Sequence, residues 1–238
     1  MYYGGYGYYG FDWTYLLVLI GVVITMAASA KVNGTFNKYS RTWSRSGMTG
    51  AEAARRILQA QGIYDVTVRE VPGNLTDHYD PRSKTVNLSA SVYGSTSISA
   101  IGVAAHECGH VIQDATNYVP LRLRAALVPA ANFGSRLAWP LIIIGVIVGG
   151  LGSPIVEIGI LLFSLAVLFQ LVTLPVEFNA SSRALRILGD SRMLAQDEVG
   201  KARQVLGAAA LTYVAAAASS ILQLLRLVIL FGGRRRDD

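Results

Sequence analysis

The sequence predicts a mainly helical protein that crosses a membrane several times and carries one small β-element. Hydrophobic residues make up 52% of the 238-residue chain and charged residues only 15%, which is too apolar for an ordinary soluble domain. The apolar residues are gathered in four long stretches, which predict membrane helices. Strand-like alternation occurs only in the polar segment after the first stretch, which places the β-element there.

The four apolar stretches are judged against the roughly 20 residues that cross a hydrocarbon core of about 30 Å. The first and third are long enough, whereas the second is short. Residues 149–154 carry a Gly- and Pro-rich turn signal, so the second and third stretches form a hairpin over 137–175. The fourth contains Arg226, and whether it crosses the bilayer stays open. The stretches are Trp13–Ala30, Leu137–Gly152, Pro154–Pro175 and Ala208–Phe231.

Basic residues predict the orientation of these segments. They are concentrated in 31–136 and 177–207, whereas the Tyr/Gly-rich tail before the first span contains none. By the positive-inside rule the N-terminus lies outside and both basic segments face the cytoplasm. The lack of positive charge in the tail also argues against a cleaved signal peptide, so we expect a retained anchor. If the fourth stretch spans, Arg234–Arg236 would lie outside, against the rule.

The polar segment after the first span is expected to fold into two helices and a β-element. Thr49 and Glu52 form a capping box that opens the first helix, and Gly62 ends it. Two alternating stretches predict short strands, and an Asp-Pro-Arg-Ser sequence between them predicts a turn. The predicted elements are a helix over 49–61, strands over 64–71 and 85–88 with a turn over 77–84, and a helix over 95–116.

The second of these helices contains the five residues His106-Glu107-Cys108-Gly109-His110, an H-E-x-x-H motif. Histidines four positions apart are separated by about 40° around a helix, so both imidazoles can bind one zinc ion at roughly 2.0–2.1 Å. The glutamate between them is placed to accept a proton from a metal-activated water. The chain has three histidines and two of them stand here, so the spacing predicts a zinc centre.

A catalytic zinc site needs three protein ligands and one open position. In one class of such sites a histidine follows His106 by ten residues, but Thr116 stands there. This class is therefore excluded. The remaining candidates are His78 and the downstream glutamates, at positions 157, 177 and 198.

Among the three glutamates, the membrane geometry favours Glu177. It follows the third apolar stretch directly, after Pro175, so a hairpin of two spans returns it to the face where the motif helix lies. Glu157 lies just after the turn of the hairpin and therefore at the opposite face. Glu198 stands in a polar stretch that is typical of a solvated helix end or turn.

Other side chains could act as metal ligands or stabilise the transition state. Cys108 is rotated by about 200° from His106, so we expect a small buried residue whose thiol points away from the metal. As a single cysteine it fits a reducing compartment. His78 could donate a hydrogen bond to the transition state, although a lone histidine in a turn is more often structural. Further candidates for that hydrogen bond are Tyr93, Tyr118 and Tyr213.

Five segments of the chain resemble the YugP-like membrane zinc metallopeptidases of bacteria, and the similarity extends from about residue 33 to residue 227. More distantly the sequence is similar to HtpX-type and CAAX prenyl proteases, in which a ligand glutamate also follows membrane helices. The resemblance implies a zincin-like core of the gluzincin type. In the distant relatives an aspartate usually follows that glutamate by four residues. Here Ser181 stands there, so the role of the aspartate is not expected to transfer. The segments are Met48–Glu52, Leu75–Lys84, Gly102–His110, Leu174–Ser181 and Leu211–Ala216.

Together these observations predict a membrane-bound zinc endopeptidase that cleaves membrane or membrane-proximal proteins at the cytoplasmic face of a bacterial cell membrane. His106, His110 and Glu177 would bind one zinc ion, and Glu107 would be the general base. Thr85–Leu88 would be an edge strand that either holds the substrate or packs against the motif helix. The alternative is a zinc-binding membrane adaptor or chaperone in membrane-protein quality control. It is disfavoured because structural zinc sites prefer four protein ligands, usually cysteines.

Two other function classes find little support. Apart from Glu157 and Arg226, the apolar stretches contain no ionisable residue that could line a translocation path. The net charge of +6 is explained by the positive-inside rule and anionic lipid, without nucleic acid as a partner. The expected division of the chain is a tail (1–12), a membrane helix (13–30), a catalytic segment (31–136), a membrane hairpin (137–175), a third-ligand segment (176–207), a last apolar helix (208–231) and a charged tail (232–238).

Overall fold

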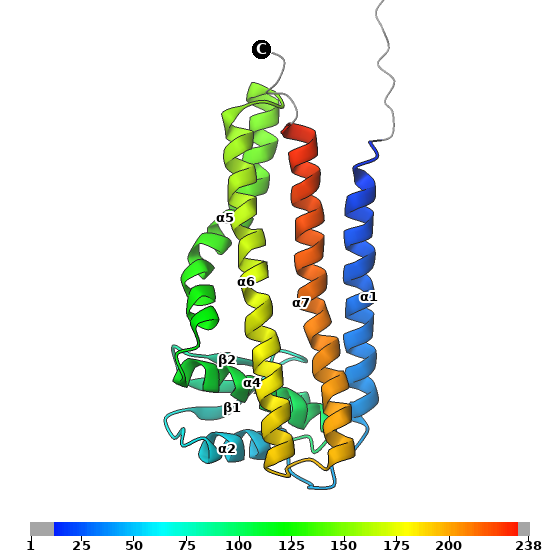
Figure 1. The fold of residues 1–238 in the computed structure, drawn as a ribbon, viewed down its shortest axis with the longest axis vertical. Helices are drawn as coiled ribbons and strands as arrows, with labels where there is room; N and C mark the ends of the chain where they lie inside the picture. Colours follow the sequence, from blue (N-terminus) through cyan, green and yellow to red (C-terminus); the bar gives the residue numbers. More distant parts are fainter. Residues whose placement is uncertain (1–11, 233–238) are drawn as a thin grey trace, which may run out of the picture.

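Residues 12–232, which the computed structural model describes, form seven helices and a three-stranded sheet (Figure 1). The mainly helical fold class with a small β-element is confirmed. Most of the Tyr/Gly-rich tail and Arg234–Arg236 lie outside the described residues. The elements are α1 (Tyr15–Ser40), α2 (Gly50–Ala60), β1 (Thr67–Val71), β2 (His78–Asp80), β3 (Thr85–Ser89), α3 (Ala90–Tyr93), α4 (Ile98–Ala115), α5 (Val119–Gly149), α6 (Pro154–Asp190) and α7 (Gln196–Phe231).

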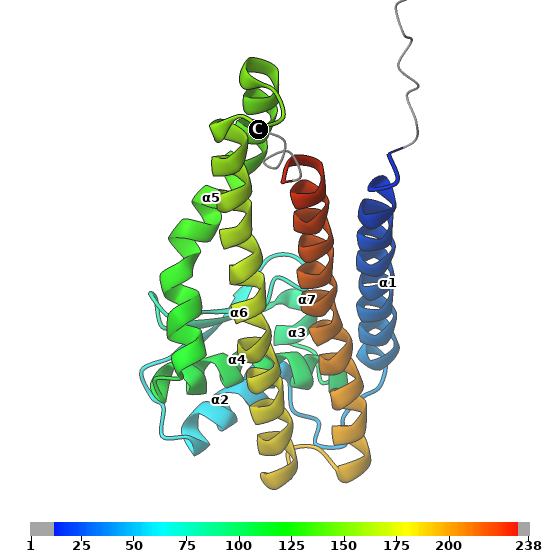
Figure 2. The same ribbon diagram turned by 45° about the horizontal axis from the view of Figure 1, so that its top comes forward.

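Four of the described helices, α1, α5, α6 and α7, are long and apolar enough to cross a membrane, by length and composition. They stand in a row in which α7 lies between α1 and α6, and α5 packs against the outer side of α6 (Figure 1; Figure 2). Along the direction of the helix axes, one end of this bundle contains the start of α1, the α5–α6 turn and the end of α7. The opposite end contains the sheet, α2 and α4 (Figure 1).

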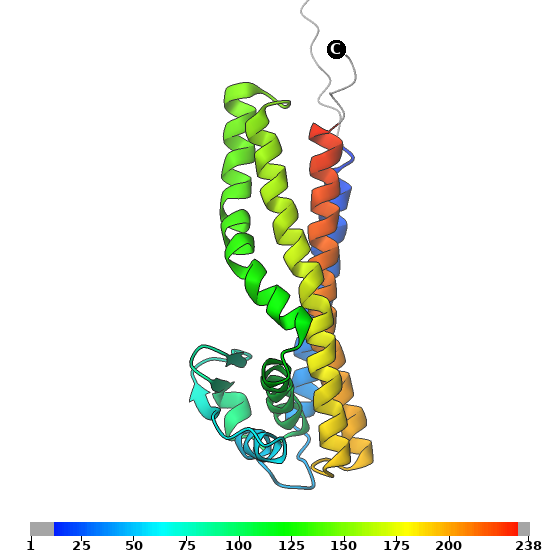
Figure 3. The same ribbon diagram turned by 60° about the vertical axis from the view of Figure 1, so that its left-hand side comes forward.

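The long helices extend beyond the apolar stretches that predict them. α5 begins at Val119 and not at residue 137, and α6 continues to Asp190, well past residue 175. The parts of α5 and α6 beyond the apolar stretches are more polar, so a search for apolar stretches does not find them. Two prolines, Pro129 and Pro140, lie inside α5, which curves away from α4 and then follows α6 (Figure 3). Helix ends therefore do not coincide with the predicted boundaries at 136 and 175.

The sheet has the strand order β1-β3-β2, with β3 parallel to β1 and antiparallel to β2. The prediction that Thr85–Leu88 is an edge strand is wrong, because these residues form the central strand. The segment predicted as a turn supplies the missing neighbour: its first residues form β2, in which His78 lies opposite Asn87 and Asp80 opposite Thr85. The edge strand that contacts α4 is therefore β2.

The motif helix α4 lies in the centre of the polar end, between α2 on one side and α6 on the other (Figure 3). The predicted capping box of α2 is present, with both Thr49–Glu52 hydrogen bonds formed. On the opposite side, a Cβ added to Gly109 would lie only 2.5 Å from the carbonyl oxygen of Ala180. A glycine at this position therefore allows the backbones of α4 and α6 to approach closely, and this contact brings the motif face of α4 against α6.

Candidate metal centre

The two motif histidines lie one turn apart on α4 and turn their Nε2 atoms toward the same point. Their ring centroids are 4.8 Å apart. On the far side of each ring, Nδ1 has a partner: His106 Nδ1 lies 3.1 Å from Ser181 Oγ, and His110 Nδ1 lies 3.0 Å from Gln113 Oε1. An amide oxygen only accepts, so His110 Nδ1 carries the proton and Nε2 of the neutral ring presents a lone pair.

Glu177 on α6 completes the cluster, as the hairpin geometry predicts. Its Oε2 lies 3.3 Å from His106 Nε2 and 3.5 Å from His110 Nε2. Its Oε1 accepts a hydrogen bond of 3.0 Å from Nη1 of Arg124 on α5. The guanidinium therefore fixes one oxygen of the carboxylate and leaves the other facing the two histidines.

The residues in this cluster fit a zinc ion. Tetrahedral coordination with bonds of about 2.0–2.1 Å separates neighbouring ligand atoms by roughly 3.3–3.4 Å, close to the two Glu177–histidine distances. Glu177 Oε2 is also a buried oxygen with no hydrogen-bond partner among residues 12–232. A buried carboxylate oxygen without a donor costs free energy, and a cation at this point would remove that cost.

The charges around His110 also favour a metal cation in this cluster. Burial favours the neutral imidazole, but the negative charges of Glu107 and Glu177 outweigh it and raise the pKa of His110 above its ordinary value. Surroundings that favour a positive charge on the imidazole also favour a metal cation beside it. Bound metal would replace the proton, because the ligand is the neutral ring.

Gln113 connects α4 to α6 and holds His110 in place. Its side chain is completely buried, and its Nε2 donates to the carbonyl oxygen of Val176 at 2.8 Å and to Oδ1 of Asn179 at 3.0 Å. Since both amide hydrogens are used, Oε1 is fixed toward His110 Nδ1. Gln113 thereby sets the orientation of one candidate ligand relative to the helix that carries another.

Ser181 occupies the position at which the distant relatives usually have an aspartate. We did not expect the role of that aspartate to transfer, yet the Ser181 hydroxyl reaches His106 Nδ1. A neutral side chain therefore contacts the imidazole from this position. A neutral hydroxyl orients the imidazole without raising its basicity as strongly as a carboxylate does.

A cavity of about 560 Å³ opens beside the cluster. Glu107 is one of its lining residues and is only 7% exposed. Of the candidates for transition-state stabilisation, His78 and Tyr213 line this cavity, whereas the hydroxyl of Tyr93 binds Arg55 and Tyr118 lies against Arg183. The cavity is formed by β2 and four helices. Its lining includes Asp77, His78, Tyr79, His106, Glu107, His110, Asp114, Arg122, Arg124, Glu177 and Tyr213.

The other candidates for the third ligand lie elsewhere. Glu157 lies in the first turn of α6, at the far end of the hairpin. Glu198 lies in the first turn of α7, but it is buried and not solvated. Its Oε2 accepts from the backbone N–H of Ala195 at 2.8 Å and its Oε1 from that of Arg45 at 2.9 Å. Cys108 is buried, and its Sγ faces the carbonyl oxygen of Ala54 on α2. The thiol therefore points to α2 and away from the cluster of His106, His110 and Glu177.

Three residues of the site escape sequence reasoning: Gln113, Arg124 and Asn179. A signal existed for Gln113, because it lies three residues after His110 and therefore near the same face of the helix. The sequence gives no comparable signal for Arg124 or Asn179, because their contacts depend on how α5 and α6 pack beside α4.

Fold and cluster together define a helical membrane protein with a candidate metal site, of the type found in zinc hydrolases, at one end of its helices. The chain belongs to the family described as "Putative neutral zinc metallopeptidase", whose profile matches residues 14–232. It is 49% identical over 222 residues to "Putative membrane protease YugP" of Bacillus subtilis (strain 168), covering 93% of this chain and 98% of that protein. No solved structure was found to match. The family resemblance of the sequence is thus confirmed, and a membrane location is supported.

Proposed function

We propose that this chain is a zinc endopeptidase that cleaves membrane or membrane-proximal proteins. The observation that carries the proposal is the convergence of Glu177 Oε2 on the Nε2 atoms of His106 and His110, with Oε2 buried and without a donor. Three protein ligands leave a fourth position open, which is typical of catalytic zinc and not of structural zinc. The cavity beside the cluster gives a substrate access to that position.

In this proposal His106, His110 and Glu177 hold the zinc ion, which when bound lowers the pKa of water and polarises a carbonyl group. Glu107 takes the proton of the attacking water and passes it to the leaving amine. Arg124 keeps the Glu177 carboxylate in its orientation through Oε1. Gln113 and Ser181 do the same for the two imidazoles.

Tyr213 is the better candidate to stabilise the negative charge that develops on the substrate carbonyl. Both ring nitrogens of His78 are already engaged: Nδ1 donates to the carbonyl oxygen of Thr76, and Nε2 accepts from Asn87 Nδ2. Neutral His78 therefore has no free N–H for a substrate. The hydroxyl of Tyr213 lies on the cavity wall and can donate a hydrogen bond.

The substrate would lie along β2. This strand is an edge of the sheet, contacts α4, and contributes His78 and Tyr79 to the cavity wall. An extended peptide can pair with its free edge, which presents the scissile bond to the site as an added strand. The role that we expected of Thr85–Leu88 is therefore assigned to β2. From the distribution of basic residues, we place this end of the molecule in the cytoplasm.

The direct test uses a Glu107→Gln variant in detergent or nanodiscs with an unfolded membrane protein as substrate. We expect the variant to bind zinc like the wild type and to lose cleavage, because only the general base is removed. Glu70→Gln, an exposed position on β1, removes the same charge as a control and should cleave normally. Near-normal cleavage by Glu107→Gln would disprove the mechanism. Stable binding of the substrate by wild-type protein without any cleavage would support the adaptor instead.

A further inference from the structure

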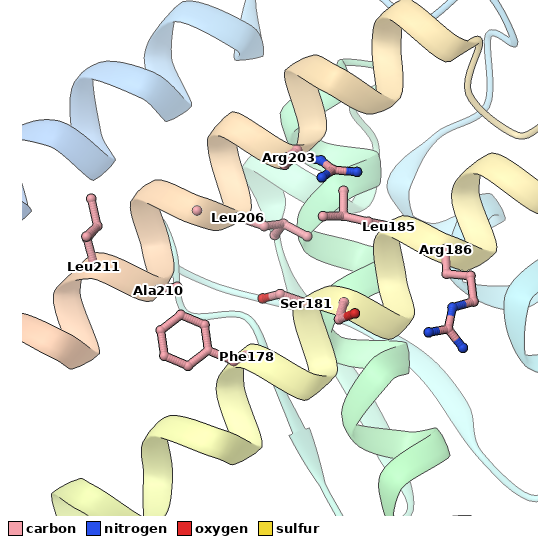
Figure 4. A pocket seen from close by; sticks show the side chains of 10 residues that line it. Phe178, Ser181, Leu185, Arg186, Arg203, Leu206, Ala210 and Leu211 are labelled. Carbon is pink, nitrogen blue, oxygen red and sulfur yellow. The ribbon is translucent and has the colours of Figure 1, made fainter.

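A second groove, of about 490 Å³, lies between α6 and α7, with α4 behind it (Figure 4). It shares no lining residue with the cavity of the candidate metal centre, although Ser181 lines the groove and contacts His106, which lines the cavity. The groove is lined by Phe178, Ser181, Ser182, Leu185 and Arg186 of α6 and by Arg203, Leu206, Gly207, Ala210 and Leu211 of α7.

The groove has an apolar end and a basic end. Phe178 and Leu211 lie toward one end, and both are about half exposed, at 49% and 48% (Figure 4). Arg186 and Arg203 lie toward the other end, beyond the facing side chains of Leu185 and Leu206. The apolar end points along the helices toward their membrane segments.

The two arginines carry charges that nothing in the described chain neutralises. Arg186 and Arg203 are exposed, and neither forms an ion pair within residues 12–232. Three arginines of the described chain do form ion pairs: Arg45 with Asp197, Arg124 with Glu177 and Arg226 with Asp12. Two unpaired guanidinium groups beside an apolar groove favour a ligand that is anionic at one end and apolar at the other.

The groove runs from the membrane segments of the two helices toward their polar ends. Phe178 follows Pro175, the last residue of the third apolar stretch, by three residues, and Leu211 lies within the last apolar stretch. Arg203 precedes the first residue of that stretch by five residues, or about 7 Å along a helix, and Arg186 follows Pro175 by eleven residues, or about 16–17 Å. The apolar end of the groove therefore lies at the edge of the apolar stretches and the basic end lies on their polar side, which is the order of acyl chain and headgroup in a lipid.

We propose that this groove binds one anionic phospholipid, with its phosphate between Arg186 and Arg203 and its acyl chains against Phe178 and Leu211. Charge complementarity selects the occupant, because a zwitterionic lipid gains less from two unpaired arginines. The bound lipid would cover Ser181, whose hydroxyl contacts His106 of the candidate metal centre.

Native mass spectrometry of the full chain in detergent, titrated with phosphatidylglycerol or phosphatidylcholine, tests the proposal. We expect Arg186→Gln/Arg203→Gln to weaken phosphatidylglycerol binding by about thirtyfold and to leave phosphatidylcholine binding unchanged, since each arginine near a lipid surface contributes about five- to sixfold. The control Arg56→Gln/Arg69→Gln removes the same charge from exposed positions on α2 and β1. If both double variants lost phosphatidylglycerol binding to the same extent, the effect would come from net charge alone, and the proposed lipid site would be wrong.

A second variant tests the groove without changing any charge. A Cβ added to Gly207 meets no atom within 4 Å, so Gly207→Leu should fold normally and place a side chain in the groove. We expect it to weaken phosphatidylglycerol binding while both arginines remain, and unchanged binding would contradict a lipid in the groove. Inorganic phosphate is expected not to compete, because it lacks acyl chains. Competition at equal concentration would show a phosphate site and not a lipid site.

Discussion

Two charged clusters lie at opposite ends of the long helices, and they differ in how completely their charges are satisfied. At the end away from the sheet, Arg226 of α7 is surrounded by groups that match it. Its Nε donates to Thr14 Oγ1 at 3.1 Å, its Nη2 lies 3.5 Å from Asp12 Oδ2, and its guanidinium lies 4.2 Å from the centroid of the Tyr15 ring. All three partners precede or begin α1, so this cluster fastens α1 to α7.

At the other end, Glu177 is only half satisfied. Arg124 occupies one carboxylate oxygen, and the other faces the Nε2 atoms of two histidines with no donor. The comparison separates structural from functional charge. Arg226, although it lies in an apolar stretch, has partners within the protein, whereas Glu177 Oε2 has no donor among residues 12–232. A metal cation would be a suitable partner for this oxygen.

The largest effect is expected from Glu177→Gln, which keeps the shape of the side chain and removes its charge. We expect zinc affinity to fall by more than about a hundredfold and cleavage to be lost. The fall is larger than that caused by removing a hydrogen-bond partner of a ligand, because a ligand itself is changed. Competition with a chromophoric chelator measures the affinity. Glu157→Gln, at the opposite end of α6, is the matched control and should bind zinc normally. A Glu177→Gln variant with unchanged affinity would remove Glu177 from the ligand set.

Gln113→Leu should have the next largest effect, because leucine fills a similar volume but cannot accept the proton of His110 Nδ1 or bind the backbone of α6. We expect zinc affinity to fall by about 10–100-fold. The same chelator competition applies, with a circular-dichroism spectrum to confirm that the helices are retained. Normal affinity in a folded variant would show that Gln113 only fills space.

Ser181→Ala removes the hydroxyl beside His106 Nδ1 and should weaken zinc binding by up to about tenfold, at the lower end of such effects because the lost partner is neutral. Ser182→Ala provides the control, since the described hydrogen bonds of the two histidines do not involve this neighbouring hydroxyl. If zinc affinity fell equally in both variants, the cause would be a general change in the helix and not the loss of the hydrogen bond to His106.

The smallest effect on zinc is expected from Arg226→Gln, which should leave metal affinity and cleavage unchanged. It should lower the melting temperature by a few degrees, because the ion pair, the hydrogen bond and the cation–π contact are lost together. Arg56→Gln, on the exposed face of α2, should leave the melting temperature unchanged. A loss of zinc in Arg226→Gln would contradict the separation of the two clusters.

Features that depend on neighbours in the chain were predictable from the sequence. The capping box at Thr49 and Glu52, the helix that carries His106 and His110, and the apolar stretches all follow from local spacing. Glu177 was also within reach, because membrane spans restrict where the chain can return. For this reason the sequence placed it correctly although 66 residues separate it from His110.

Features that depend on lateral packing were not predictable. Arg124 lies in α5 before its internal prolines, and its contact with Glu177 depends on how α5 packs against α6. The position of β3 was mistaken because the turn signal around Asp80 concealed the three residues of β2. A one-dimensional pattern shows that a strand is present, but the order of strands depends on partners elsewhere in the chain.

The zinc K-edge X-ray absorption spectrum of the purified, zinc-loaded protein tests the central claim most directly. Two imidazoles, one carboxylate and one further light atom predict a shell of nitrogen and oxygen at about 2.0–2.1 Å, multiple scattering from two histidine rings, and no sulfur at about 2.3 Å. Loss of the carboxylate contribution in Glu177→Gln would complete the assignment. A sulfur shell, which Cys108 alone could supply within a site on α4, or scattering from fewer than two imidazoles would contradict it.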